Sequence, residues 1–193
     1  AGSGDNGYIK TFNIPADGSS ITQVYSYKHD GIQGKYNSFV QADSNTYVLA
    51  YAGSGNDGYI KTFTIPSTGT SITQVERVEH DNVRGEYNSL SRISGGSDNY
   101  ILAYAGPDSE GGSAYDGFIK TFTIPADGST VTQTYVLEHT DNQAEWNSLV
   151  QVDEDTYALG FAGSGDDGYV STFTVRASDQ VAPTISAVTL AAD

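Results

Sequence analysis

Residues 36–78 read YNSFVQADSNTYVLAYAGSGNDGYIKTFTIPSTGTSITQVERV, and this stretch decides the fold of the 193-residue chain. Short segments rich in β-branched and aromatic residues occupy 36–41, 47–52, 59–65 and 72–78, and polar turns separate them. In the last turn Pro66 presets φ and Gly69 permits a positive φ, a combination typical of hairpin connections. No segment has a sustained helical period. The stretch therefore predicts four antiparallel strands and almost no helix.

The same pattern recurs along the chain. An Asp/Asn-Gly-aromatic motif places Gly7, Gly58, Gly117 and Gly168 at separations of 51, 59 and 51 residues. A Tyr/Trp-Asn-Ser motif that begins at residues 36, 87 and 146 has matching separations. Internal repeats of this length are typical of propellers and other repeat architectures. We divide residues 1–175 into units near 1–34, 35–85, 86–144 and 145–175.

A unit of four antiparallel strands with this period resembles the blade of a β-propeller. The residue pattern of the repeat is similar to that of repeats in large secreted or surface proteins of bacteria. The kelch double glycine and the WD dipeptide are missing. The resemblance implies an all-β, propeller-like fold of about three and a half blades. Residues 176–193 depart from the repeat, and 181–185 (VAPTI) resemble the entry into a bacterial immunoglobulin-like domain. We expect there a linker and the start of a following domain, or an added strand.

The expected strands do not complete a ring. The units contain 13 strands, or 14 if the tail adds one, whereas propellers use about 4–8 whole blades. Three arrangements stay open: further blades from a longer parent chain, two copies whose 28 strands make seven blades, or an open stack with unpaired edges. We expect the chain to associate with itself or with the rest of a parent chain.

Composition excludes several classes of function. The chain has 24 acidic and 9 basic residues, a net charge of −15, which argues against a nucleic-acid partner. No apolar run is long enough for a membrane span. The chain has no Cys and hence no disulfide or thiolate zinc site, and no Met, so we expect a piece of a longer protein. The family resemblance places that protein outside the cell or on its surface.

Three histidines, His29, His80 and His139, recur at one place in successive units. Equivalent positions of neighbouring blades lie too far apart for shared metal ligation, which needs distances near 2.1 Å. We expect each ring to hydrogen-bond a nearby Asp or Ser and to join two blades. Lys10, Lys61 and Lys120 share a strand position where the last unit has Ser171, and we expect them to snorkel or to protect an edge rather than to act as bases.

The acidic glycine loops suggest calcium, and no other cofactor is expected. Their carboxylates are hard oxygen ligands, although the loops do not follow the EF-hand pattern. The alternative is ordinary turn chemistry, in which Asp-Gly and Asn-Gly are frequent. The candidate calcium ligands are Asp5, Asp57, Asp116, Asp166 and Asp167.

The Tyr/Trp-Asn-Ser motif gives a second candidate site. Aromatic rings beside amides suit sugars, whose apolar faces stack while their hydroxyls take hydrogen bonds. The alternative is regular packing between blades. The candidate glycan-binding residues are Tyr36, Asn37, Tyr87, Asn88, Trp146 and Asn147.

These observations favour a non-enzymatic extracellular module for adhesion, display or assembly within a larger surface protein. A lectin-like, carbohydrate-binding propeller is the alternative. A fragment of a polysaccharide-active enzyme is a weaker alternative, because a catalytic site breaks the repetition and few residues do so here. Those residues are Arg84, Arg92, Glu110, Glu145 and Trp146.

Overall fold

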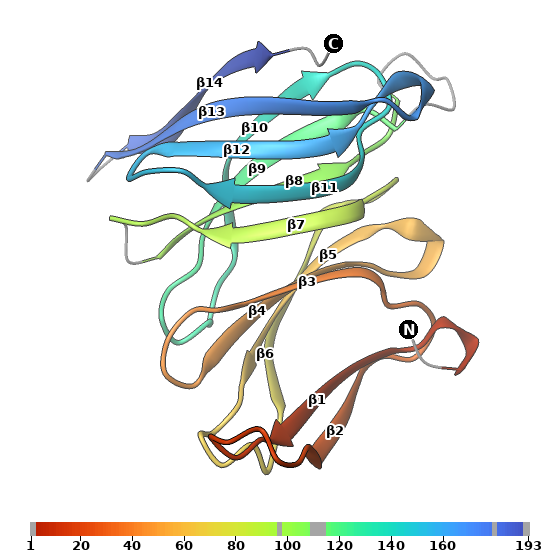
Figure 1. The fold of residues 1–193 in the computed structure, drawn as a ribbon, viewed down its shortest axis with the longest axis vertical. Coiled ribbons are helices and arrows are strands. Elements are labelled where there is room, and N and C mark those ends of the chain that lie inside the picture. The colour runs from red at the N-terminus through yellow and green to blue at the C-terminus, as the bar shows by residue number, and fades with distance from the viewer. Residues whose placement is uncertain (1–2, 96–97, 109–114, 179–180, 191–193) are drawn as a thin grey trace.

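The computed structural model describes residues 3–95, 98–108, 115–178 and 181–190, which form 14 strands in four antiparallel sheets (Figure 1). Sheet A contains β1 (Gly7–Asn13) and β2 (Thr22–Asp30). Sheet B contains β3 (Lys35–Gln41), β4 (Thr46–Ala52), β5 (Gly58–Thr64) and β6 (Thr73–Asp81). Sheet C contains β7 (Glu86–Arg92), β8 (Asn99–Ala105), β9 (Gly117–Thr123) and β10 (Thr132–Thr140). Sheet D contains β11 (Glu145–Gln151), β12 (Thr156–Ala162), β13 (Gly168–Ser178) and β14 (Val181–Leu190).

Each four-stranded sheet is a meander in which neighbouring strands follow one another along the chain. The four strands expected within residues 36–78 are confirmed, with the fourth continuing to Asp81. Helix is confined, in the described residues, to three 3₁₀ turns: Ser3–Asp5, Ser54–Asn56 and Ser164–Asp166. The all-β, propeller-like prediction is confirmed, and the sheets are open rather than closed into a barrel.

The C-terminal tail forms a strand of the last sheet. Residues 181–190 pair with β13 from Val170↔Leu190 to Ser178↔Val181. The tail is thus the added strand among the two expectations, and the resemblance to an immunoglobulin-like domain receives no support.

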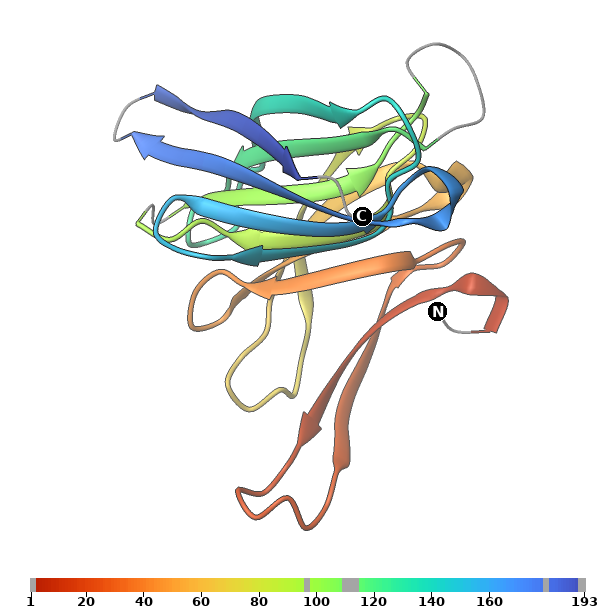
Figure 2. The same ribbon diagram turned by 45° about the horizontal axis from the view of Figure 1, so that its top comes forward.

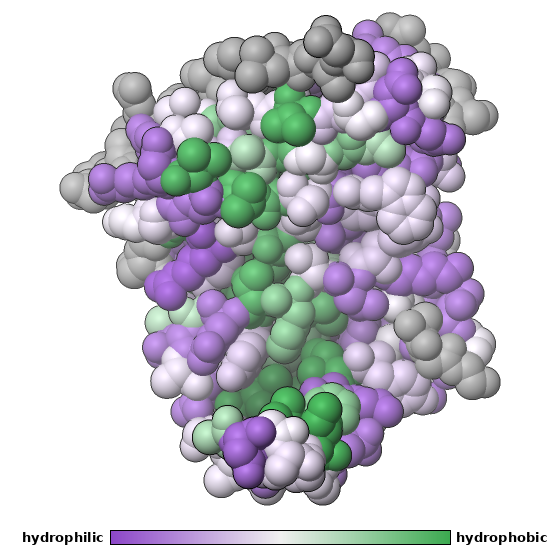
Figure 3. All heavy atoms as spheres, viewed as in Figure 1, coloured by the Kyte–Doolittle hydropathy of each residue, from purple (hydrophilic) through white to green (hydrophobic). Residues whose placement is uncertain are grey.

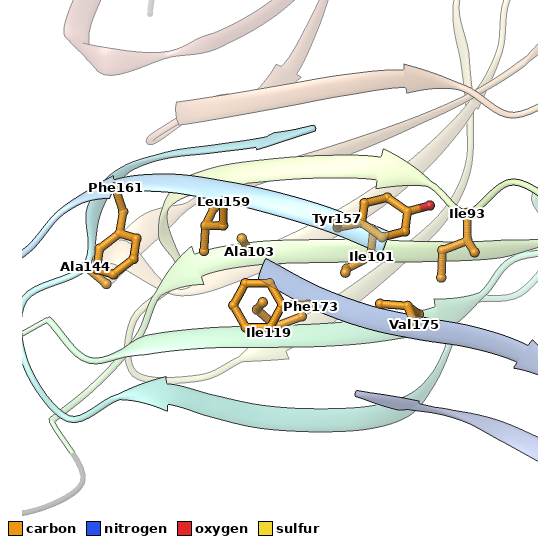
Figure 4. Packing of buried hydrophobic residues seen from close by; sticks show 10 residues of the cluster. All are labelled: Ile93, Ile101, Ala103, Ile119, Ala144, Tyr157, Leu159, Phe161, Phe173 and Val175. Carbon is orange, nitrogen blue, oxygen red and sulfur yellow. The ribbon is translucent and has the colours of Figure 1, made fainter. Parts of the chain in front are cut away.

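The hydrophobic core lies between successive sheets. Leu49 and Tyr51 of β4 pack toward sheet A, whereas Val48 and Ala50 pack toward sheet C. Successive side chains of a strand point to opposite faces, so a strand with neighbours on both sides is apolar throughout. Between sheets C and D, side chains of β8, β9, β12 and β13 point toward one another (Figure 4).

The sheets follow one another from β1–β2 at one end to sheet D at the other (Figure 1). The first strands β3, β7 and β11 are neighbours, and the hairpin β1–β2 projects from the remainder (Figure 2). An apolar band runs along the face on which these first strands lie (Figure 3). It is the side that would face the axis of a complete propeller.

Sheet A supplies only the outer half of a blade. β1 begins at the same Asp/Asn-Gly-aromatic motif as β5, β9 and β13, so β1 and β2 occupy the third and fourth positions. If two copies merged their sheets A, neither would supply first and second strands. This geometry counts against a seven-bladed ring made of two copies.

Candidate functional site

Two kinds of loop meet at one end of the sheets. The loop between the second and third strands accepts a hydrogen bond from the segment that leads into the next sheet. The three bonds are Gly34 N to Asp5 O, Gly85 N to Asn56 O and Ala144 N to Tyr115 O, each 2.8 Å long. Most of the candidate residues therefore lie on or next to one face of the molecule.

Tyr36, Tyr87 and Trp146 form a row of rings on that face, here named the aromatic ladder. The ring centroids of Tyr36 and Tyr87 are 4.3 Å apart, and those of Tyr87 and Trp146 are 4.8 Å apart. Trp146 ends the ladder and is 68% exposed. The structure thus joins residues of three repeats into one continuous aromatic surface, which the separate motifs did not reveal.

The ladder stands on a strained backbone. Its three residues have φ of 51°, 51° and 55°, in the left-handed region that non-glycine residues rarely adopt. Each lies at a register shift between the first and fourth residues of its strand. Such conformations cost about 1–3 kcal/mol each and concentrate at functional sites.

The amides of the motif hold this bulge. Asn37, Asn88 and Asn147 donate from Nδ2 to the carbonyl oxygen three residues earlier, at 2.9, 2.8 and 3.0 Å. One donor of each amide therefore stabilises the backbone under the ladder.

The serines of the motif connect neighbouring sheets. Ser38 Oγ accepts a hydrogen bond from Leu90 N, and Ser89 Oγ accepts one from Leu149 N, both at 2.9 Å. The equivalent Ser148 is exposed on β11, the first strand of the last sheet. One three-residue motif therefore supplies the ladder, its support and the bond to the next sheet.

The histidines lie between sheets. The rings of His29, His80 and His139 contact Tyr51, Tyr104 and Phe161 of the following sheet edge-on, with centroids 4.8, 4.9 and 5.1 Å apart. Burial lowers the pKa of His29 and His139 to about 4 and that of His80 to about 3. Within the described residues, no hydrogen bond joins these ring nitrogens to an Asp or Ser, so aromatic packing takes the place of the expected bonds.

The histidines also explain the glycine of the Asp/Asn-Gly-aromatic motif. A Cβ on Gly7, Gly58 or Gly117 would overlap the adjacent imidazole. The positive φ values of the loop belong instead to earlier residues such as Asn56, at 70°. The motif glycine thus permits close approach, and turn chemistry explains only the residues before it.

Buried lysines clamp the first two interfaces. Lys61 and Lys120 are only 5% and 7% exposed, and they donate to the carbonyl oxygens of His29 and His80 in the preceding sheet. The Lys120 ammonium is 3.6 Å from Asp81 Oδ2. Burial lowers the pKa of both lysines. The expectation of edge-protecting lysines was wrong at these two positions, because the preceding sheet covers them.

A tyrosine completes each clamp. Tyr51 donates to Asp30, and Tyr104 donates to Asp81, both at 3.0 Å. Burial raises the pKa of each phenol, which keeps the donor proton in place. We name these sets the clasps; they consist of Asp30, Tyr51 and Lys61 between sheets A and B, and Asp81, Tyr104 and Lys120 between sheets B and C.

The candidate calcium ligands are separate in space or already engaged. Asp5 forms a 3.0 Å ion pair with Lys35, and Asp166 accepts a 3.0 Å hydrogen bond from Gln143. Asp116 is buried, Asp57 follows the turn Ser54–Asn56, and Asp167 is exposed. Within the described residues, no three His, Asp or Glu side chains form a metal-binding group.

Of the unit-specific residues of the enzyme alternative, Arg84, Glu145 and Trp146 lie near Glu86 and Tyr87. The Arg84 guanidinium lies 4.2 Å from the centre of the Tyr115 ring and 3.7 Å from Glu86 Oε2. Glu145 begins β11, Arg92 ends β7, and Glu110 lies outside the described residues. No helix in the described part of the chain is long and apolar enough to cross a membrane.

Solved structures share this architecture at low sequence identity. The alignment with a protein from Lactobacillus plantarum covers 93% of this chain and 49% of that protein's chain, at a TM-score of 0.66 and 14% sequence identity. The alignment with Sqt1 of Saccharomyces cerevisiae covers 96% of this chain and 46% of the Sqt1 chain, at a TM-score of 0.57 and 11% sequence identity. An α-L-arabinofuranosidase from Lactobacillus brevis covers 81% with 53% of its own, at 12% identity and a TM-score of 0.46, too low for any argument.

No protein-family model matches the chain, and no curated protein sequence matches it. The chain spans about half the length of the solved structures it resembles. At these identities the likeness concerns the fold alone, and it identifies a β-propeller-like arrangement of four-stranded antiparallel sheets.

Proposed function

We propose that this chain is a non-enzymatic module of a larger extracellular or cell-surface protein, acting in adhesion, display or assembly. The observation that carries the proposal is an unfilled blade interface on sheet A. Side chains that are buried at every internal interface are exposed there.

The third strands make this comparison directly. Phe12 of β1 is 50% exposed, whereas its equivalents Phe63, Phe122 and Phe173 are at most 1% exposed. Lys10 is exposed, whereas Lys61 reaches into the preceding sheet. Burying one large apolar side chain is worth about 1.5–3 kcal/mol, so a preceding blade would stabilise this face.

The chemistry of the clasp indicates which partner fits. Lys10 requires a strand that ends in His-Asp, as β2 and β6 do. Residues 181–190 of sheet D contain neither residue, so a second copy cannot offer a matching end through β14. This favours a further blade of the parent chain as the partner, with a second copy as the other arrangement.

Chemical labelling of Lys10 tests the proposal. An extended chain carries a copy of residues 35–85, then a copy of residues 35–51, directly before Ala1. We expect acetylation of Lys10 to slow to the rate of Lys61 and Lys120, because the added blade covers it. A control extension of equal length made of Gly and Ser should leave Lys10 reactive.

Lys10 that reacts equally fast in both extended chains would contradict the proposal. Light scattering of the natural chain over a concentration series tests the other arrangement. A dimer that dissociates in Phe12→Ser but not in Val83→Ser, another exposed apolar position, would identify a second copy as the partner.

Carbohydrate binding is a second candidate function, favoured by the aromatic ladder. The exposed indole of Trp146 offers a stacking surface, and it is the single tryptophan of the chain. A bound glycan should change its fluorescence saturably, and Trp146→Ala should abolish binding. An unchanged emission across a broad glycan panel would count against this function.

A further inference from the structure

The third interface lacks its clasp. Between sheets C and D, Thr140, Phe161 and Ser171 stand where the earlier interfaces have Asp, Tyr and Lys. All three polar or charged partners are replaced together. Losing Lys alone would leave a carboxylate buried without its counter-charge, which is strongly destabilising. The concerted change instead gives a neutral interface.

A cavity of about 170 Å³ occupies this interface. Its polar lining consists of the His139 imidazole and of hydroxyl and amide side chains from three segments, and its aromatic lining includes Phe161 and Tyr169. These two rings are stacked with centroids 5.5 Å apart. The hydroxyl and amide side chains are Thr140, Asn142, Gln143, Ser164 and Ser171.

Size and chemistry restrict the ligand. A cavity near 150 Å³ holds about one six-membered ring, and drug-sized ligands need at least about 300 Å³. His139, which also lines the cavity, is neutral at physiological pH because burial lowers its pKa to about 4. A charged ligand would meet no counter-charge among the lining side chains. An uncharged ring with several hydroxyl groups can use both the amide and hydroxyl groups and the aromatic surface.

We propose that this cavity is a binding site for one neutral monosaccharide ring. The site goes beyond the assembly function, because it lies at the opposite end of the described sheets from β1. It is also separate from the ladder, because Trp146 is not among its lining residues. Loss of the clasp is what creates the site.

Rebuilding the clasp should close the site. The triple variant Thr140→Asp, Phe161→Tyr, Ser171→Lys restores a side-chain set that the chain already accommodates twice. Titration with neutral methyl glycosides, followed by saturation-transfer NMR and calorimetry, should give one millimolar or tighter site in the natural chain. We expect at least tenfold weaker binding in the triple variant, with an unchanged circular dichroism spectrum. Ser26→Lys, which makes the same Ser-to-Lys change at an exposed position of sheet A, should bind as the natural chain does.

The reciprocal variant provides an independent measurement. Asp81→Thr, Tyr104→Phe, Lys120→Ser removes the clasp between sheets B and C, and Val83→Asn with Arg84→Gln in the same variant supplies the equivalents of Asn142 and Gln143. We expect its stoichiometry to rise from one ring to two. If this variant does not fold, the glycoside titration of the first triple variant alone tests the proposal. A folded reciprocal variant that binds only one ring would overturn the link between the clasp and the site.

Three other results would overturn the proposal. The first is the absence of saturable binding by any methyl glycoside of the panel. The second is unchanged glycoside binding in the triple variant. If in addition Trp146→Ala abolishes binding, the sugar binds on the ladder and not in the cavity. The third is stronger binding of butylammonium than of any glycoside. That result would show that the cavity prefers an alkylammonium group, like the lysine side chain that occupies the equivalent place at the other interfaces.

Discussion

At the scale of single residues, the fold depends on an imidazole lying against a glycine. His80 covers Gly58 in the same sheet and contacts Tyr104 in the next. The ring can fill the gap between two sheets only because residue 58 has no side chain and because the ring is uncharged. Both conditions lead to measurable predictions.

Gly58→Ala should destabilise the protein, because the new Cβ overlaps the His80 ring and the ring or the strand has to shift. Overpacking of this kind costs about 1–3 kcal/mol. Gly168→Ala is the matched control, since it has the same place in sheet D and no heavy atom within 4 Å of the added Cβ. Urea unfolding of both variants measures the difference, and equal midpoints would refute the role of close approach.

Stability should fall as the pH decreases from 6.5 to 4. The folded-state pKa values of His29, His80 and His139 lie below the unfolded value of 6.5, so the unfolded chain binds more protons in this range. The stabilisation is complete above pH 6.5 and is lost as the pH approaches the folded values, by up to about 3 kcal/mol for each histidine.

Thermal unfolding at intervals of half a pH unit measures this slope. His139→Gln should flatten the slope by the share of one histidine, because glutamine does not titrate. A melting temperature that is constant between pH 6.5 and 4.5 would show that the histidines are not buried in their neutral form.

At the scale of elements, the ladder and the clasps each turn a repeated motif into a contact between sheets. Sheets B, C and D have first and second strands, whereas sheet A has none among the described residues. The edge of β1 that corresponds to the β4-facing edge of β5 is therefore unpaired within sheet A. An unpaired edge is open to addition of a strand.

Completing sheet A should stabilise the molecule. A copy of residues 35–51 placed before Ala1 restores the natural spacing, since residues 1–7 read AGSGDNG and residues 52–58 read AGSGNDG. We expect slower hydrogen exchange of the β1 amides and a melting temperature higher by several degrees, at about 2–4 °C per kcal/mol. If the residues copied from Val48 and Ala50 are changed to Asp, the gain should disappear, because these side chains would face sheet B. Unaltered exchange in β1 would refute the pairing.

At the scale of the whole molecule, a net charge of −15 acts on an open row of sheets. Like charges repel one another in the compact state, and salt screens this repulsion over about 10 Å at 0.1 M. The packing between sheets therefore works against a general electrostatic cost.

The melting temperature should rise between 20 and 300 mM NaCl, a range over which the screening length falls roughly fourfold. CaCl₂ at equal ionic strength tests the candidate calcium ligands. We expect it to act as NaCl does, since Asp5 and Asp166 already have partners. A much larger effect of calcium, reversed by chelator, would instead identify a calcium site.

The sequence by itself determined the strands, their order and the repetition. These follow from local rules: β-branched and aromatic residues favour extended backbone, and Pro and Gly end it. The sequence could not assign Lys61 to a buried clasp, because a strand lysine is buried or exposed depending on which sheet lies against it.

Tertiary structure alone decided three further features. The rings of Tyr36, Tyr87 and Trp146 meet only because successive first strands are neighbours, and their positive φ is imposed by bulges that no propensity predicts. The structural role of the motif glycine depends on a histidine that lies more than 20 residues away in the sequence. The replacement of Lys by Ser171 was visible in the sequence, yet the cavity was not, because its walls come from two sheets. A contact between distant segments depends on how whole sheets pack, which local preferences do not specify.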